Sequence, residues 1–161
     1  FHAAKEIVFD PALNRGEIGT EECFRNYFSV PISEDQMKKI IDIWTTNWKP
    51  ADEMIKLIKN LKKKYRLAML SNSDYINSKN YTKKGWYSYF EILILSHEIG
   101  ILKPDKRIYE ILIKKLREKP ADCLFIDDQQ ECLDVAKKMG MKTILFKDIK
   151  QLKNELSVMG I

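Results

Sequence analysis

The chain has 161 residues, which is enough for one domain or for a core with a small appendage. Its 28 Lys and Arg residues against 23 Asp and Glu give a mild net charge of +5. The densest basic run, residues 61–66, lies at the end of a predicted helix, where cations complement the helix dipole. A solvent-exposed helical face is therefore favoured over a nucleic-acid-binding surface for this run. No apolar run approaches the length of a membrane span. From the charge pattern and the absence of such a run, we expect neither nucleic acid nor membrane as a partner.

The cysteines indicate a reducing compartment. Cys23, Cys123 and Cys132 are odd in number and lack the spacing of metal or redox motifs. The first ten residues carry no signal-peptide pattern. We therefore expect reduced thiols and a cytoplasmic location.

Three helical segments are predicted before residue 64. Thr20 can cap the first, and Ser33 with Gln36 forms a capping box for the second. Pro50 opens the third. Aromatic residues at helical spacing on this part of the chain could line a substrate pocket, but packing between helices is favoured. They are Phe24, Tyr27, Phe28, Trp44 and Trp48.

From Tyr65 the pattern changes to strands alternating with helices. Apolar runs predict strands at residues 66–70, 91–95, 122–126 and 142–146. Amphipathic runs predict helices near residues 75–84, 105–117, 130–139 and 148–158. This alternation is typical of an α/β fold with a doubly wound parallel sheet.

Polar residues follow two of these strands, and each has an ordinary alternative explanation. Asp127 and Asp128 could be a helix cap followed by a solvated acid. Adjacent acids at a strand end repel one another unless a cation lies between them, and Mg²⁺ takes oxygen ligands of this kind. Ser71, followed by Asn72, could be a plain turn residue. Lys103, which precedes Pro104, could be an ordinary surface lysine.

The order of these residues along the chain carries more information than any one of them. A strand-end Ser in SNS (71–73), a Lys in GILKPDKRIYE (100–110) and the acid pair in LFIDDQQ (124–130) follow one another. This order resembles motifs two, three and four of the haloacid dehalogenase-like hydrolases. The subgroup of small phosphatases with a helical cap is the most similar, and the resemblance covers nearly the whole chain. It implies a helical cap at residues 1–49 and a Rossmann-like core at residues 50–161.

The resemblance also implies roles for individual residues. Ser71 and Asn72 would bind a phosphoryl oxygen, and Lys103 would neutralise charge on the nucleophile and the phosphoryl group. Asp127 and Asp128 would hold Mg²⁺, with Asp128 the safer assignment. Cys132 stands four residues beyond Asp128, where the family often has Asn or Asp, which weakens one contact around the metal.

The first motif of the family is the main departure. It needs an apolar strand that ends in an Asp nucleophile, with a second Asp two residues later as general acid. Asp10 after Ile7 is the one candidate, but its strand is short and Ala12 stands where the acid belongs. RGEIGTEECF (15–24) resembles a stretch inside the cap. We therefore expect the chain to begin within the cap, without the first strand and its nucleophile.

The resemblance implies a Mg²⁺-dependent phosphatase of a small phosphorylated metabolite that works through an aspartyl-phosphate. A non-catalytic binding or assembly module of the same fold is the alternative. A metal-independent dehalogenase-type hydrolase is a third, and the acid pair speaks against it. The first strand would lie between the strands ending at Leu70 and Ile126, and its absence would leave them about 9 to 10 Å apart. Another segment or chain could supply it.

Overall fold

The computed structural model describes residue 7, residues 10–46 and residues 49–161. The chain divides into two compact units, residues 1–102 and residues 103–161, and each is described by itself. The predicted division into a cap at residues 1–49 and a core at residues 50–161 describes functional parts, whereas these two units are separated by their internal contacts. The cap and the core stay a prediction. Within the described residues, no helix combines the length and the apolar character needed to cross a membrane.

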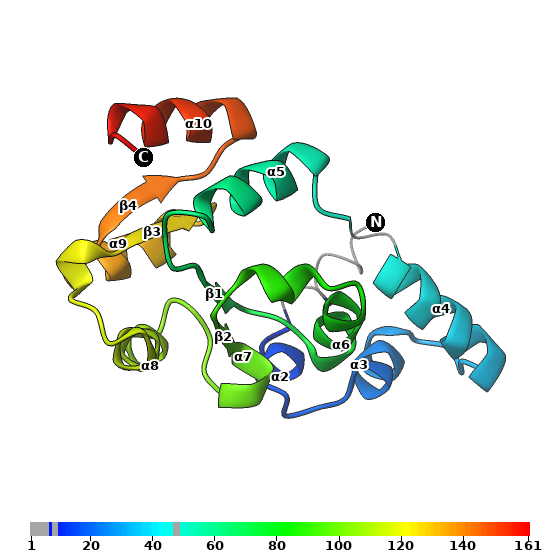
Figure 1. Cartoon of the computed structure of the whole chain (residues 1–161). Helices are drawn as coiled ribbons and strands as arrows, with labels where there is room; N and C mark the ends of the chain where they lie inside the picture. The colour runs from blue at the N-terminus through cyan, green and yellow to red at the C-terminus, as the bar shows by residue number, and fades with distance from the viewer. Residues whose placement is uncertain (1–6, 8–9, 47–48) are drawn as a thin grey trace. The chain divides into compact units, whose positions relative to one another are not determined.

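The first unit begins with helices, and its later part contains two strands with helices between and after them (Figure 1). Its early helices are α2 (Pro11–Asn14), α3 (Thr20–Tyr27), α4 (Glu34–Thr46) and α5 (Asp52–Leu61). Its later elements are β1 (Ala68–Ser71), α6 (Tyr75–Lys83), the 3-10 helix η1 (Trp86–Tyr89), β2 (Ile92–Leu95) and α7 (Ser96–Ile99). The short elements η1 and α7 were not predicted, because four residues are too few to show a helical period.

The second unit alternates helix and strand throughout. Its elements are α8 (Lys106–Leu116), the 3-10 helix η2 (Pro120–Asp122), β3 (Leu124–Asp127), α9 (Gln130–Lys138), β4 (Lys142–Leu145) and α10 (Ile149–Val158). With the strands and helices of the first unit they confirm the predicted α/β fold, and the helix ends agree with the prediction to within one residue.

The four strands form two parallel pairs, β1 with β2 and β3 with β4. The ladders pair Ser71 with Leu95 and Asp127 with Leu145. Ser71 and Asp127 are therefore the last residues of their strands, whereas the apolar pattern placed them just after. The predicted strands at residues 66–70 and 122–126 also began two residues too early, since backbone pairing and not side-chain polarity sets the limits of a strand.

Most helix caps agree with the sequence signals, but the prediction for Thr20 is wrong. Gly19 is the N-cap of α3, Thr20 is the first residue of that helix, and its buried Oγ1 makes no hydrogen bond with the described residues. Ser33 and Gln36 form the capping box, with the Ser33 N–H donating to Gln36 Oε1 at 2.9 Å and the Gln36 N–H donating to Ser33 Oγ at 3.3 Å. Asp105 and Asp148 accept from backbone N–H groups at the starts of α8 and α10. These caps satisfy backbone donors that would otherwise lack partners.

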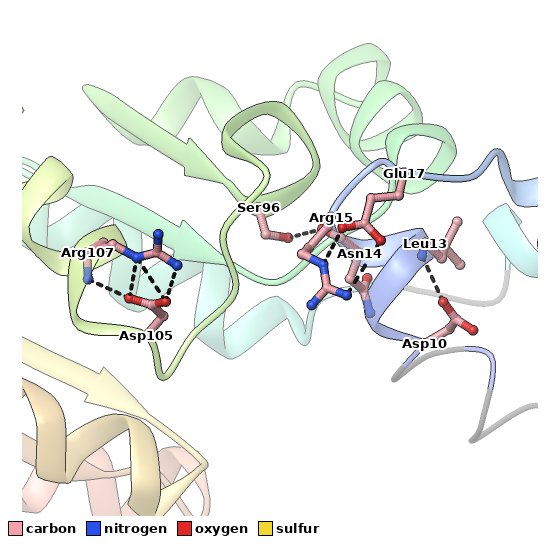
Figure 2. Close-up of polar contacts among 8 residues, drawn as sticks. All are labelled: Asp10, Leu13, Asn14, Arg15, Glu17, Ser96, Asp105 and Arg107. Atoms are coloured by element: carbon pink, nitrogen blue, oxygen red, sulfur yellow. Dashed lines mark hydrogen bonds and ion pairs between the residues drawn. The ribbon is translucent and has the colours of Figure 1, made fainter.

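Asp10 is also a helix cap. Its Oδ1 accepts the N–H of Leu13 at 2.8 Å at the start of α2, as Figure 2 shows. Pro11 occupies the first turn of that helix, where its missing N–H costs nothing. Of the candidate strand before Asp10, Val8 and Phe9 lie outside the described residues, as does Trp48.

Each unit has its own apolar interior. In the first, Phe24 of α3 packs edge-on against Trp44 of α4, as expected for aromatic residues packed between helices. Phe24 is also stacked 6.3 Å from Phe28, the exposed C-cap of its own helix. Ile7, Leu13, Cys23 and Met37 complete this cluster. In the second, Tyr109 and Phe125 make an edge-to-face contact at 5.4 Å, and buried aliphatic residues of α8, α9 and α10 surround the strand pair.

Candidate functional site

A buried ion pair joins the predicted lysine to the first predicted acid. Lys103 Nζ lies 2.6 Å from Asp127 Oδ2, and the two side chains are 12% and 6% exposed. Asp127 is the last residue of β3, and Lys103 stands three residues before α8. The sequence therefore identified two residues, 24 positions apart, whose charged groups meet. Because both side chains are largely removed from water, solvent could not take the place of either partner if the other were lost.

The second oxygen of Asp127 is also engaged. Its Oδ1 accepts the backbone N–H of Gln129 at 3.0 Å. This bond closes a turn directly after β3 and holds the carboxylate in one orientation. Lys103 therefore faces a carboxylate that the backbone has already fixed, which is how a charged group is kept in place for chemistry.

Asp128 has a different environment from its neighbour. It is exposed, and within the described part of the chain its carboxylate meets no cation. A carboxylate in this state can still give oxygen ligands to a hard cation. Because Mg²⁺ in proteins keeps several waters and commonly takes one or two carboxylates together with substrate phosphate, the residues present fit this ion. Among the described residues, here or elsewhere, no group of three or more His, Cys, Asp or Glu side chains could hold a metal ion by itself.

Cys132, in α9, is buried and contacts Gln129 of the turn after β3. Its side chain is 0% exposed, and its Sγ lies 3.5 Å from Gln129 Oε1. The Tyr109 hydroxyl donates to the Cys132 carbonyl at 3.0 Å. Burial raises the pKa of the thiol, so it stays neutral at physiological pH. Cys132 is therefore a packing residue of α9 that contacts the turn after β3 through the Gln129 side chain.

Ser71 ends β1 in the first unit and begins a loop, residues 71–74, that we call the β1 loop. It is half-buried, and its Oγ donates to the Asn72 carbonyl at 3.3 Å. Asp74 closes the loop as the N-cap of α6, and its two oxygens accept the N–H and the side-chain amide of Asn77. The β1 loop is thus a short segment held at both ends, and it carries the Ser71 hydroxyl and the Asn72 side-chain amide.

Two residues of this region were missed by the sequence reasoning. Asp74 is 5% exposed and stands three residues before Asn77, a spacing that signals a helix cap. Ser96 is wholly buried directly after β2, and its hydroxyl accepts the Ser73 N–H at 2.9 Å. A serine after an apolar strand was a visible signal, but its partner in the β1 loop depends on the pairing of β1 with β2.

Ser71 belongs to the first unit, and Lys103, Asp127 and Asp128 belong to the second. Within the second unit the structure brings Lys103 and Asp127 together next to Asp128. That Ser71 and Asn72 act on the same ligand as these residues stays a prediction.

Comparisons with known proteins address the family. A family model described as "Hydrolase: haloacid dehalogenase-like hydrolase" matches residues 12–140. Among curated proteins, the bifunctional epoxide hydrolase 2 of Rattus norvegicus is 38% identical over 68 residues, which is 42% of this chain and 12% of the rat protein. The chain thus matches about an eighth of that relative. The D-ribitol-5-phosphate phosphatase of Bacteroides thetaiotaomicron is 24% identical over 154 residues, 91% of this chain and 75% of the relative.

Solved structures show the same fold. A HAD family enzyme from Bacteroides thetaiotaomicron superposes with a TM-score of 0.76 at 24% identity, covering 94% of this chain and 79% of the other. The same enzyme in complex with magnesium and inorganic phosphate gives a TM-score of 0.74 at 24% identity, covering 88% and 77%. A predicted HAD-like family hydrolase from Porphyromonas gingivalis gives 0.75 at 22% identity, covering 96% and 84%.

Proposed function

Since this chain belongs to the haloacid dehalogenase-like hydrolases, we propose that it is a Mg²⁺-dependent phosphatase of a small phosphorylated metabolite. The observation that carries the proposal is the buried Lys103–Asp127 pair beside the exposed Asp128. It supplies a fixed cation for a phosphoryl group and an available carboxylate for a metal. These are the two electrostatic requirements of phosphoryl transfer.

The two acids take separate roles in this proposal. Asp127 orients Lys103, since both of its oxygens are already engaged by Lys103 and the Gln129 N–H. Asp128 gives an oxygen to Mg²⁺, which when bound polarises a phosphoryl oxygen and offsets its charge. Lys103 neutralises the negative charge that surrounds the attacking carboxylate and the phosphoryl group.

Ser71 and Asn72 complete the phosphate-binding residues in this proposal. A hydroxyl and an amide can donate to phosphoryl oxygens without adding charge. The β1 loop is anchored at one end by the pairing of Ser71 with Leu95 and at the other by the bond from the Asn77 N–H to Asp74. This anchoring supports the role, because donors held in place before the substrate binds need little reorganisation.

The nucleophile of the proposed reaction is a carboxylate on a further strand. Its oxygen attacks phosphorus and the bond from phosphorus to the substrate oxygen breaks, with the second Asp of the Asp-x-Asp run giving its proton to the leaving oxygen. Water then hydrolyses the aspartyl-phosphate, which releases inorganic phosphate and frees the nucleophile. Asp10 is not proposed for this step, because its Oδ1 caps α2. A segment or chain that adds a strand beside β1 or β3 would supply the carboxylate.

The named relatives support a small phosphorylated substrate. The Bacteroides relative is a D-ribitol-5-phosphate phosphatase. A bifunctional riboflavin kinase/FMN phosphatase of Arabidopsis thaliana is 32% identical over 117 residues, 71% of this chain and 29% of the relative. A cytoplasmic location is part of the proposal, and the three free cysteines support it.

The test begins with the gene upstream of Phe1, where an apolar run ending in Asp-x-Asp is expected. The 161-residue chain should not hydrolyse p-nitrophenyl phosphate, whereas the protein with that run should. In the active protein Lys103→Ala should lower turnover at least tenfold, and Lys106→Ala, which removes an exposed lysine, should not. Turnover by the 161-residue chain that disappears in Asp10→Asn would overturn the assignment of the nucleophile.

A further inference from the structure

Ser96 joins two segments that are distant in the sequence. Its side chain is 0% exposed, and its Oγ accepts the Ser73 N–H at 2.9 Å and donates to the Asn14 carbonyl at 2.6 Å. Figure 2 shows the Ser96 side chain directed at Asn14. Because the hydroxyl is buried, water cannot replace it as acceptor for Ser73 or as donor for Asn14. One hydroxyl therefore connects the β1 loop with the end of α2.

Gly16 gives an independent sign that this end of α2 is docked tightly. Its φ is +71°, a conformation that favours glycine, and a Cβ added to it would lie 2.5 Å from the His97 carbonyl oxygen. The backbone at residues 14–16, which we call the α2 turn, thus lies directly against residues 96–97. Any side chain at position 16 must push the two segments apart.

The β1 loop is held from its other side by α6. Ser78 Oγ donates to Ser73 Oγ at 3.3 Å, and the Tyr87 hydroxyl donates to Ser78 Oγ at 3.4 Å. Ser78 and Tyr87 are buried. Ser73 therefore lies between a chain of hydroxyls from α6 and η1 and the Ser96 hydroxyl that leads to the α2 turn.

We infer that Ser96 is a positioning residue that makes the conformation of the β1 loop depend on the docking of the α2 turn. When the α2 turn lies against residues 96–97, the Ser96 hydroxyl is held with its lone pair toward Ser73. When the α2 turn moves away, the hydroxyl loses the Asn14 carbonyl and turns toward its other acceptor, the Ser73 carbonyl, which lies 3.4 Å from Oγ. The bond that Oγ accepts from the Ser73 N–H is then weakened. The inference rests on the proposed function only in that residues 71–72 bind phosphate.

The first test follows amide hydrogen exchange of Ser73 in Gly16→Ala and in the matched variant Gly19→Ala. Gly19 has an ordinary φ of −76°, and a Cβ there meets nothing within 4 Å. Exchange at Ser73 should become about tenfold faster in Gly16→Ala, as expected when a buried donor loses its acceptor, and should not change in Gly19→Ala. An unchanged Ser73 rate in Gly16→Ala would overturn the inference, because it would mean that the loop does not respond to the α2 turn.

The second test uses Ser96→Ala, alone and combined with Gly16→Ala. Ser96→Ala should speed exchange at Ser73 as much as Gly16→Ala does, and the double variant should add little, since both changes break one connection. Additive effects would show that the two residues act separately and would contradict the inference. If Ser96→Ala does not fold, the Gly16→Ala and Gly19→Ala comparison decides the matter.

The third test separates positioning from general stability. Inorganic phosphate, titrated in the presence of Mg²⁺, should shift the amides of residues 71–72 in the unchanged chain. In Ser96→Ala this phosphate affinity should fall about tenfold, while the Mg²⁺ response near Asp128 stays the same. Equal phosphate affinity in both proteins would overturn the positioning role. If the unchanged chain gives no phosphate response, the proposed function fails, and the exchange experiments still decide the coupling.

Discussion

Lys103 Nζ and Asp127 Oδ2 lie 2.6 Å apart and are almost completely removed from solvent. The lysine begins the second unit and the aspartate ends its first strand. Burying such a pair has a large desolvation cost, and good geometry only offsets it. The pair is therefore weak evidence for stability as such and stronger evidence that a fixed charge is needed at this position.

Removing one member of the pair should destabilise the fold strongly. In Lys103→Ala the Asp127 carboxylate stays buried without its cation, and we expect a loss of about 3–5 kcal/mol in the free energy of unfolding. Urea denaturation measures this loss. The matched variant Lys106→Ala breaks the exposed pair with Glu110 and should cost less than about 0.5 kcal/mol. Equal effects of the two substitutions would contradict the assignment of a buried pair.

Mg²⁺ should bind near Asp128 with low affinity, because only one or two carboxylates are available there. Titration with Mg²⁺ should therefore shift the backbone amides around residues 127–130 first. Asp128→Asn should abolish these shifts, and Asp122→Asn, which changes an exposed acid of η2, should leave them intact. Shifts confined to other surface acids would count against the site.

The edges of β1 and β3 that lack a partner strand among the described residues should accept an added strand. In the described residues each of these strands pairs along one edge only, with β2 and with β4 respectively. Unpaired backbone groups favour strand addition. A peptide with an apolar run ending in Asp-x-Asp should slow amide exchange in β1 and β3 and raise the melting temperature. A peptide of the same composition in scrambled order is the control, and equal effects of both peptides would remove support for a specific strand.

Stability should fall at alkaline pH, in part through Cys23. Its thiol is 0% exposed, and burial, followed by Asp10 and Asp74, raises its pKa from 9.0 to about 11. Between pH 9 and 11 the unfolded chain releases this proton while the folded chain keeps it. Stability from this group is therefore fully present below pH 9 and is lost as the pH rises toward 11, by about 3 kcal/mol at most.

Urea denaturation of the unchanged chain and of Cys23→Ala between pH 8 and about 10.5 checks this sign. Cys23→Ala should be less stable at pH 8, because it loses buried volume. Its stability should also fall less steeply with pH. Parallel pH dependence of the two proteins would show that Cys23 does not contribute.

Local patterns in the sequence determined the elements and their order. The apolar runs before Ser71 and Asp127, the capping box at Ser33 and the Asp caps at Asp105 and Asp148 are all short-range signals, and the structure contains each. Such signals are readable because a cap or a strand period depends on residues close together in the chain. The order of Ser71, Lys103 and the acid pair was likewise enough to indicate the family that the comparisons support.

Only the tertiary structure decided which polar groups meet. The sequence predicted that Asp127 and Asp128 would hold the metal together. In the structure Asp127 is buried at the end of β3 in an ion pair with Lys103, and Asp128 is exposed. Ser96 had no role in the sequence reasoning, because its partners at Asn14 and Ser73 are 82 and 23 residues away. Contacts over such separations depend on how strands pair and helices dock. The sequence alone does not show whether a serine hydroxyl is buried or exposed.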